Sequence, residues 1–382
     1  MISIPFILLA LVVLFLLVES LLLARVRRAL PVRILVLGTR GKSTVTEYIA
    51  AALRSSGRRT LAKTTGSRPT LIMPDGSHRR IRRRGRARLQ EQFGVLFRAS
   101  RMGCDALVLE CMSVSPELQR LESRLLRPTL AVLTNILDDH REVYGSDAAW
   151  RVKAFASSLP AQTLLISGER VHAEEVRLAA ERRNTSVTVP ASLPGSPGRD
   201  LPVSIDASNA LLAQTAAECL GISAGEAYAA IGALPDAPLY REVALPEDGV
   251  LLRFLNAFAV NDVESASRFL DAWKHRLPDW ERTVILFNTR SDRPLRSLQF
   301  ARWCATLRDV QTIILIGTHV PRTRRELHRL GVPPHSVVPW TRDQIARPLE
   351  ALRPHVASGT VVVGVGNAAG DGLRLMEATE ML

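Results

Sequence analysis

A short glycine-rich segment carries the residues best suited to phosphate chemistry: Gly38, Thr39, Arg40, Gly41, Lys42, Ser43 and Thr44. Glycines let backbone N–H groups close around phosphate oxygens, and the N-terminus of a following helix adds partial positive charge. Lys42 can reach the β- and γ-phosphates of a nucleotide, and the hydroxyl of Ser43 or Thr44 can bind Mg²⁺. The structural alternative is an ordinary glycine turn that caps a helix. In a strand–loop–helix context, the segment predicts a nucleotide site.

The surrounding pattern predicts that context. An apolar run over 33–38 indicates a buried strand, and residues 43–55 have helical periodicity. Further strand-like runs, with helical patterns between them, lie at 106–110, 130–134 and 163–167. Alternation of this kind predicts a P-loop-type, doubly wound α/β domain. A loop rich in Pro, Gly and Ser follows at 190–203, and a helix is expected over 208–220.

A second α/β pattern occupies the C-terminal part, with strand-like runs at 250–254, 283–288, 312–317 and 360–365. Three prolines, Pro235, Pro238 and Pro246, cluster before it and favour a domain boundary. We therefore expect a central domain over 31–240 and a smaller Rossmann-like α/β domain over 241–382.

The N-terminal segment, residues 1–30, predicts a membrane anchor. Residues 2–24 are almost wholly apolar, and a helix over them would rise roughly 33 Å, enough to cross a hydrocarbon core. Arg25, Arg27 and Arg28 follow, and basic residues favour the cytoplasmic side, so we expect a single-pass protein of the cell membrane with cytoplasmic catalytic domains. A cleaved signal peptide is the alternative, but it places its positive charge before the apolar stretch.

The spacing within the glycine-rich segment narrows the family. A general P-loop has four residues between its first glycine and the Gly-Lys pair, whereas here only Thr39 and Arg40 intervene. This shorter form resembles the Mur ligase superfamily. The resemblance implies that Glu110, at the end of Ala-Leu-Val-Leu-Glu, and His140, in Thr-Asn-Ile-Leu-Asp-Asp-His, bind magnesium beside ATP.

The same resemblance assigns roles to four further residues. Thr64 and Thr65 match the family's second hydroxyl-bearing loop near the γ-phosphate. Asn209 matches a residue near the adenine, although a simple N-cap is an equal alternative. Lys153 is the only lysine in the window where many members carry a carbamylated lysine.

Several stretches are similar to the membrane-anchored ligase subunit of capsule-type poly-γ-glutamate synthases. They include 62–66, 81–85 with 91–92, 108–112, 256–262, 288–294 and 364–367, together with the apolar N-terminus. One departure from the wider superfamily is Ala257, which stands where a ribose-binding Asp is usual. The likeness implies an ADP-forming ligase that activates a carboxylate as an acyl phosphate and adds glutamate; the sequence does not distinguish D- from L-glutamate.

Two other functions stay open at this stage. One is a folylpolyglutamate-type ligase, against which the anchor argues, and the other is a membrane-tethered nucleotide-binding scaffold, against which Glu110 and His140 argue. The expected partners are glutamate, anionic polyglutamate, the membrane and other membrane subunits of a polymer synthesis and export complex.

The strong basic charge, +13 overall, fits such a polyanionic partner. The run 78–86 concentrates it and could hold the carboxylates of a growing polymer, or else form a solvated or membrane-facing loop. The run contains no aromatic residue for base stacking, so nucleic acid is not an expected partner. In the second domain, Arg290, Asp292 and Arg293 could contact substrate or form a structural ion pair.

Overall fold

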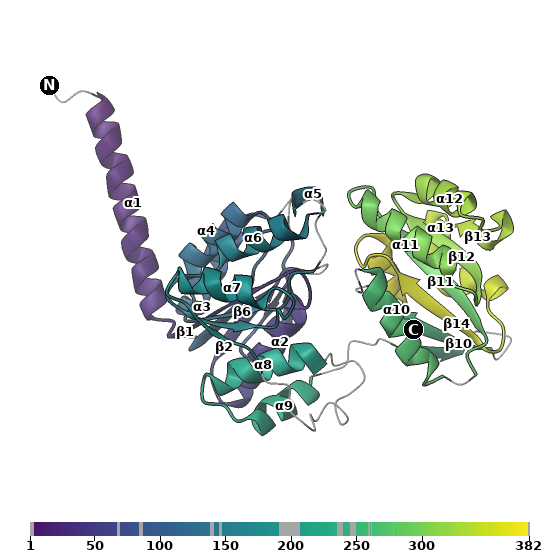
Figure 1. The fold of residues 1–382 in the computed structure, drawn as a ribbon, viewed down its shortest axis with the longest axis horizontal. Helices are drawn as coiled ribbons and strands as arrows, with labels where there is room; N and C mark the ends of the chain where they lie inside the picture. Colours follow the sequence, from purple (N-terminus) through teal and green to yellow (C-terminus); the bar gives the residue numbers. More distant parts are fainter. Residues whose placement is uncertain are drawn as a thin grey trace. The chain divides into compact units, whose positions relative to one another are not determined.

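The computed structural model describes residues 4–66, 69–83, 87–137, 141–144, 147–190, 207–234, 240–244, 250–258, 260, 262–277 and 279–380. The chain forms two compact units, Met1–Pro235 and Asp236–Leu382. Each unit is built around one mixed sheet with helices against it (Figure 1).

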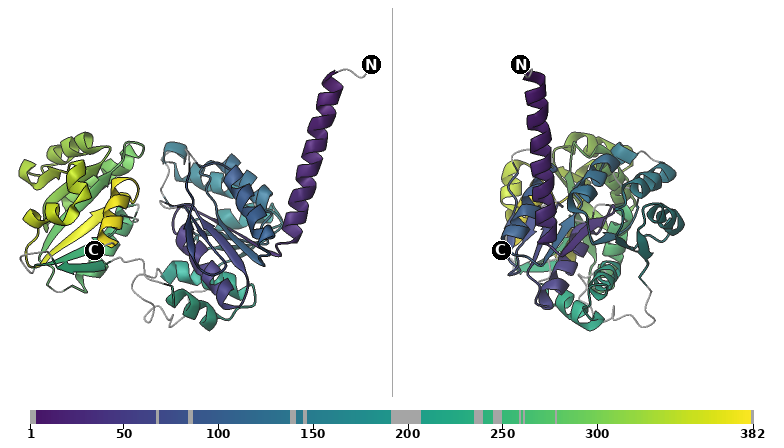
Figure 2. Two further views of the ribbon diagram at one scale, coloured as in Figure 1. Left: turned by 180° about the vertical axis from the view of Figure 1, so that it is seen from behind. Right: turned by 90° about the vertical axis from the view of Figure 1, so that its left-hand side faces the viewer.

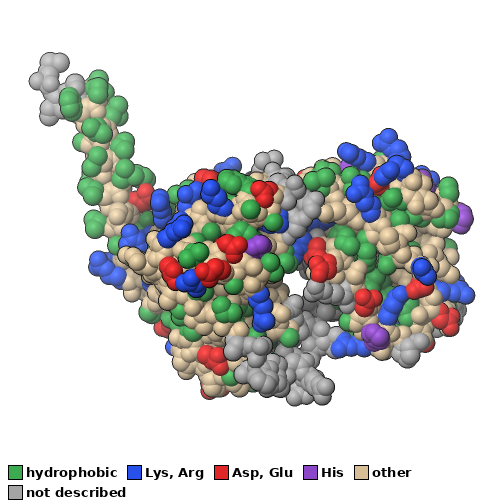
Figure 3. All heavy atoms as spheres, in the orientation of Figure 1, with side chains coloured by type: hydrophobic (Ala, Val, Ile, Leu, Met, Phe, Trp, Pro, Cys, Tyr) green, Lys and Arg blue, Asp and Glu red, His purple; other side chains and the backbone are tan. Residues whose placement is uncertain are grey.

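The first helix, α1 (Ile4–Arg28), extends from the first unit and exposes apolar side chains along its length (Figure 3). It is the one helix among the described residues with the length and composition to cross a membrane. Its last turn is fixed to the domain, because Val26 is buried in the core and the Arg27 guanidinium donates to the carbonyl of Leu125 at 2.7 and 2.9 Å. The basic residues that follow the apolar stretch therefore belong to the helix.

The first unit contains an eight-stranded sheet in the order β4-β3-β2-β5-β1-β6-β7-β8. Its strands are β1 (Val32–Leu37), β2 (Thr60–Thr64), β3 (Thr70–Ile72), β4 (His78–Arg80), β5 (Ala106–Glu110), β6 (Leu130–Leu133), β7 (Leu164–Ser167) and β8 (Ser186–Thr188). All pairs are parallel except β2–β3 and β3–β4. The carboxyl ends of the parallel strands thus meet at one edge, where a doubly wound sheet places its ligands.

Helices cover both faces of this sheet, as Figure 2 shows. Along β1, Ile34 and Val36 face one core while Leu35 and Leu37 face the other, which the two-residue period of a strand requires. One face is covered by α2 (Lys42–Ser55), α8 (Ala207–Glu218) and α9 (Ala224–Gly232). The other is covered by α3 (Gln90–Arg101), α4 (Pro116–Leu126), α6 (Ala148–Ser158) and α7 (Ala173–Glu181), with the short α5 (Arg141–Tyr144) beside α6.

The second unit has a six-stranded sheet in the order β13-β12-β11-β14-β10-β9. Its strands are β9 (Tyr240–Ala244), β10 (Leu251–Asn256), β11 (Arg282–Thr289), β12 (Val310–Gly317), β13 (Val337–Pro339) and β14 (Thr360–Val365), and only β9 pairs antiparallel. Its helices are α10 (Val263–Lys274), α11 (Pro294–Thr306), α12 (Val320–Arg329), α13 (Arg342–Ala346), α14 (Pro348–Leu352) and α15 (Asp371–Glu380), with short 3₁₀ turns at Pro334–Ser336 and Arg353–His355.

The predicted fold class is confirmed. The N-terminal helix, expected over 2–24, is observed over Ile4–Arg28, and the other predicted strands and helices differ from the observed ones by at most two residues at either end. Besides β2, the strands for which the sequence pattern gave no range are β3, β4, β8, β9 and β13. They form the edges of the two sheets or lie next to an edge, where a short strand shows too few residues for a clear period. Most of the predicted loop at 190–203 lies outside the described residues.

Candidate active site

The glycine-rich segment forms a tight turn between β1 and α2. Gly38 and Gly41 adopt φ angles of +123° and +77°, which L side chains rarely adopt. Space also demands glycine, because a Cβ atom on Gly38 would lie 2.1 Å from Thr134 Oγ1 and one on Gly41 would lie 2.5 Å from Asn209 Oδ1. The backbone is therefore held close to its neighbours at the N-terminus of α2, as a phosphate-binding turn requires.

Asn135, two residues after the end of β6, fixes this loop through its side chain. Its Oδ1 accepts hydrogen bonds from the Thr39 hydroxyl at 2.7 Å and the Arg40 backbone N–H at 3.1 Å, and its amide donates to the Arg40 carbonyl at 3.3 Å. Lys42 Nζ donates to the Gly38 carbonyl at 2.8 Å and so lies over the loop. Sequence analysis overlooked Asn135; its place at the end of a parallel strand was the available signal.

Glu110 joins three segments at the carboxyl edge of the sheet. It ends β5 and is 3% exposed, and its Oε2 accepts the Ser43 hydroxyl at 2.7 Å and the Thr65 backbone N–H at 2.6 Å. Thr64 is the buried last residue of β2. A Cβ atom on Gly66 would lie 3.1 Å from Ser43 Oγ, so the turn after β2 is in close contact with the phosphate loop.

The oxygens of Glu110 and Ser43 are of the hard type that Mg²⁺ prefers, so the two side chains fit a shared magnesium site. His140, the third expected ligand, lies outside the described residues. Within the described part of the chain, no three or more His, Cys, Asp or Glu residues gather as a metal cluster. Among the described residues, the oxygens that fit the site are the Glu110 carboxylate and the Ser43 hydroxyl, which suit a cation that also binds phosphate oxygens.

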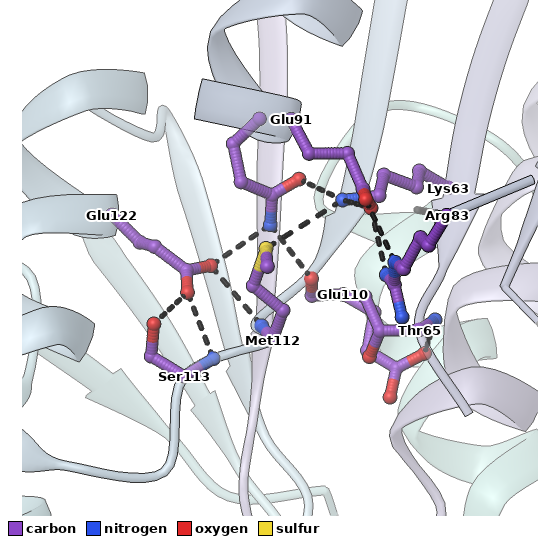
Figure 4. Close-up of polar contacts among 9 residues, drawn as sticks. Lys63, Thr65, Arg83, Glu91, Glu110, Met112, Ser113 and Glu122 are labelled. Atoms are coloured by element: carbon purple, nitrogen blue, oxygen red, sulfur yellow. Dashed lines mark hydrogen bonds and ion pairs between the residues drawn. The ribbon is translucent and has the colours of Figure 1, made fainter. Parts of the chain in front are cut away.

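A buried polar network lies beside Glu110 (Figure 4). Lys63 has no solvent exposure, and its Nζ lies 2.7 Å from both Gln92 Oε1 and Glu91 Oε1. Arg83 donates two hydrogen bonds of 2.7 Å to the Glu91 carboxylate. Burial lowers the pKa of Lys63, although the hydrogen bond from Lys63 to Glu91 opposes this. Burial would raise the pKa of Glu91, but hydrogen bonds from Arg83 and Lys63 lower it to about 2.

The network fixes the main chain around the end of β5. Gln92 Nε2 donates to the Glu110 carbonyl at 3.1 Å and to Glu122 Oε2 at 2.9 Å. Glu122 in turn accepts the backbone N–H groups of Met112 at 3.1 Å and Ser113 at 2.8 Å. The strand end that presents Glu110 is thus held from α3 and α4 as well as from the sheet. Sequence analysis overlooked Glu122, which sits within an ordinary helical pattern, and singled out Gln92 only as part of the family resemblance, without a role.

The remaining predicted residues fall in different places. Thr44 lies in the first turn of α2. The side chain of Asn209, on α8, lies close to Gly41 of the phosphate loop, since a Cβ atom on Gly41 would come within 2.5 Å of Asn209 Oδ1. Lys153 is exposed on α6, and no contact in the described chain joins it to Glu110 or the loop.

The second unit carries the other candidate groups. The Arg290 guanidinium pairs with Asp292 and donates to Asn367 Oδ1 at 3.1 Å, an arrangement that joins the ends of β11 and β14. Asp262 caps α10, accepting the Ser265 N–H at 2.8 Å. Both observations favour structural roles for these carboxylates.

Sequence comparison finds two families along the chain. Residues 36–191 match the Mur ligase middle domain, and residues 244–382 match the poly-gamma-glutamate synthase CapB C-terminal domain. A protein of Bacillus subtilis (strain 168), PGA synthase CapB, is 30% identical over 362 residues, which cover 91% of this chain and 90% of that protein. The capsule biosynthesis protein CapB of Bacillus anthracis is 28% identical over 355 residues, 90% of this chain and 75% of that protein.

Solved structures share the fold at low sequence identity. E. coli FolC in complex with ADP has a TM-score of 0.69 at 16% identity and covers 94% of this chain and 91% of its own. Mycobacterium tuberculosis folylpolyglutamate synthase, complexed with ADP and AMPPCP, has a TM-score of 0.65 at 16% identity and covers 94% and 92%. At this identity the likeness concerns the arrangement of elements.

Proposed function

This chain belongs to the CapB family of Mur-type ligases, and we propose that it makes poly-γ-glutamate, using ATP to join glutamate units by amide bonds and releasing ADP and phosphate. The observation that carries the proposal is the convergence on Glu110, whose single oxygen Oε2 binds both Ser43 of the phosphate loop and Thr65 of the turn after β2. This places the acidic group beside the residues that would hold the transferred phosphoryl group.

In the proposed reaction, an oxygen of the acceptor carboxylate attacks the γ-phosphorus of ATP, ADP leaves, and an acyl phosphate forms. The amine of the next glutamate attacks the acyl carbon, the amide bond forms, phosphate leaves, and the amine loses a proton. Activation is required because a carboxylate is a poor electrophile. Lys42 and the backbone N–H groups of the loop would bind the phosphates, so the protein contributes mainly positioning and charge neutralisation.

Ser43 and Glu110 would hold Mg²⁺, with His140 as the third proposed ligand, and the ion would neutralise charge on the triphosphate and the acyl phosphate. Thr64 and Thr65 would contact the γ-phosphate, and Asn209 the nucleotide. Lys153 stays a proposed carbamylation site, although its side chain is exposed.

The protein would act at the cell membrane as part of a polymer synthesis complex. Helix α1 would serve as a single-pass anchor with both α/β units in the cytoplasm. Two features support this: the apolar surface of α1 and the gathering of basic side chains where it meets the first unit (Figure 3). Other membrane subunits would extend and export the chain.

The deciding experiment is glutamate-dependent ATP turnover. Purified full-length protein in detergent, with any co-encoded membrane partner, receives Mg·ATP and glutamate, and ADP, phosphate and polymer are assayed. We expect ADP release with a γ-linked product in the wild type and in Lys274→Ala, and loss of both in Lys42→Ala. Lys274 is the matched control because it forms an exposed ion pair with Asp309 in the second unit.

ATP binding without glutamate-stimulated turnover, with partners present, would contradict the ligase and favour a membrane-tethered nucleotide-binding scaffold. Turnover that depends on a folate in place of polyglutamate would favour the folylpolyglutamate-type ligase, whose fold this chain shares.

A further inference from the structure

The outer edge of the first sheet is a basic strand. Its edge strand is β4, whose residues are all exposed. The segment from His78 to Arg88 contains seven arginines and no acidic residue. Among the described arginines of this segment, Arg79, Arg80, Arg82 and Arg88 are exposed and Arg83 is half-buried. A charged edge strand discourages pairing with other chains, but either positive or negative charge would serve that role. It therefore does not explain why every charge in this run is positive.

Strand register connects this edge to the candidate active site. Thr64 is paired with Thr70, and Thr70 with Arg80, so Arg80 lies level with Thr64, two strands away. At about 4.8 Å between strands, the two backbones are roughly 10 Å apart. Because β2–β3 and β3–β4 are both antiparallel, β4 runs parallel to β2 and ends at the same edge of the sheet. The basic strand therefore leads towards Thr65 and Glu110.

The chain that follows β4 continues in that direction. The Ile81 N–H donates to the Pro69 carbonyl at 2.8 Å, which keeps the segment beside the turn after β2. Arg83 then forms its two hydrogen bonds with Glu91, next to Lys63. Hydrogen bonding to Glu91 raises the pKa of Arg83, and the nearby charge of Glu110 adds to this. Arg83 thus lies within electrostatic range of the candidate magnesium ligand.

Arg83 and Glu91 also show how this segment binds a carboxylate. The guanidinium contacts both carboxylate oxygens at 2.7 Å, the fork geometry that a lysine cannot reproduce. Arg79 and Arg82, which precede it, carry the same side chain and are exposed, so a polyanion in solvent can reach them.

We propose that the basic edge, defined as Arg79 and Arg82, binds the carboxylates of the growing γ-linked polyglutamate and leads its terminal carboxylate to the site at Glu110. This rests on the proposed function, because it names the acceptor of that reaction as the occupant of the surface. Several exposed charge pairs act together, so the affinity should rise with polymer length and fall with salt.

The test measures binding apart from turnover. Full-length protein in detergent is titrated against a fluorescein-labelled γ-glutamate decamer, and fluorescence anisotropy reports affinity at low and high salt. The test variant is Arg79→Gln/Arg82→Gln, and the matched control is Arg322→Gln/Arg325→Gln, which removes two exposed arginines from α12 in the second unit. Arg79→Lys/Arg82→Lys keeps the charge without the fork.

We expect the test variant to lose decamer affinity by about tenfold at low salt, with the difference shrinking at high salt, as for two exposed charge pairs. The lysine variant should lose less, and the control should match the wild type. A γ-glutamate trimer should bind more weakly and distinguish the variants less.

Wild-type affinity for the decamer in Arg79→Gln/Arg82→Gln would overturn the proposal. So would a variant that keeps decamer binding but loses affinity for micelles containing phosphatidylglycerol, since that outcome assigns the edge to the membrane surface. Failure of the proposed function is distinguishable: the wild type would then bind the decamer through these arginines and show no glutamate-dependent ADP release.

Discussion

The Lys63 amino group donates to Gln92 Oε1 at 2.7 Å, and both residues are buried: Lys63 is 0% and Gln92 1% exposed. Gln92 passes this contact on by donating to the carbonyl of Glu110. A buried cation thus orients an amide, and the amide fixes the strand end that carries the candidate magnesium ligand. We regard Lys63 as a positioning residue on this basis.

Replacing Lys63 with methionine should destabilise the protein. The change keeps most of the volume but leaves Glu91 and the Gln92 carbonyl without their buried partner, which should lower the free energy of unfolding by about 3 kcal/mol. Denaturant unfolding of the full-length protein in detergent measures this. Lys274→Met, at an exposed pair, should cost under about 1 kcal/mol. Equal losses in both variants would show that burial of Lys63 is irrelevant.

Acid stability should depend on Glu91. Its pKa is lowered to about 2 in the folded protein, below the ordinary value near 4.3 of an unfolded chain. A depressed carboxyl pKa stabilises the fold above the unfolded value, and this contribution is lost as the pH falls through about 4 towards 2. Glu91→Gln should therefore flatten the pH dependence of the unfolding midpoint in that window. An unchanged slope would contradict the pairing with Arg83 and Lys63.

Glu110→Gln should strongly reduce turnover while leaving the fold intact. Glutamine keeps the shape and can still accept the Thr65 N–H, but it removes the negative charge proposed to bind Mg²⁺. We expect at least about a hundredfold loss in glutamate-dependent ADP release, together with a higher Mg²⁺ requirement. Glu350→Gln, an exposed residue of α14, is the control. Wild-type magnesium dependence in Glu110→Gln would exclude Glu110 as a ligand.

The sequence predicted those parts of the site that lie in or next to a regular element. Gly41 could be placed because the glycine spacing has a visible pattern, whereas Glu110 was singled out by the resemblance to Mur ligases. Parallel strands bring their carboxyl ends together, which places the two residues at the same edge of the sheet. Glu110 contacts Ser43 because β5 lies beside β1 in the sheet. This strand order cannot be predicted from a local sequence pattern.

The supporting network was not predictable in the same way. Lys63 is buried because Glu91 and Gln92 reach it from α3, well separated in sequence. Without those contacts, a lysine in a short strand would be predicted to be exposed to solvent. Asn135 is a similar case. It contacts the phosphate loop only because β6 pairs with β1, which brings Thr39 within hydrogen-bonding distance of its side chain.

Gly41→Ala should weaken nucleotide binding by more than its loss of folding stability accounts for. Alanine at φ +77° is strained, and its Cβ would meet Asn209 Oδ1 at 2.5 Å, so the loop must move. We expect a loss of about 1–2 kcal/mol in stability and at least tenfold in ATP affinity, measured by calorimetry. Gly57→Ala separates the two effects: φ is +82° there, but nothing lies within 4 Å of the new Cβ. Gly57→Ala should therefore show similar backbone strain and bind ATP normally. Equal ATP affinities of Gly41→Ala and Gly57→Ala would show that the loop does not bind the nucleotide.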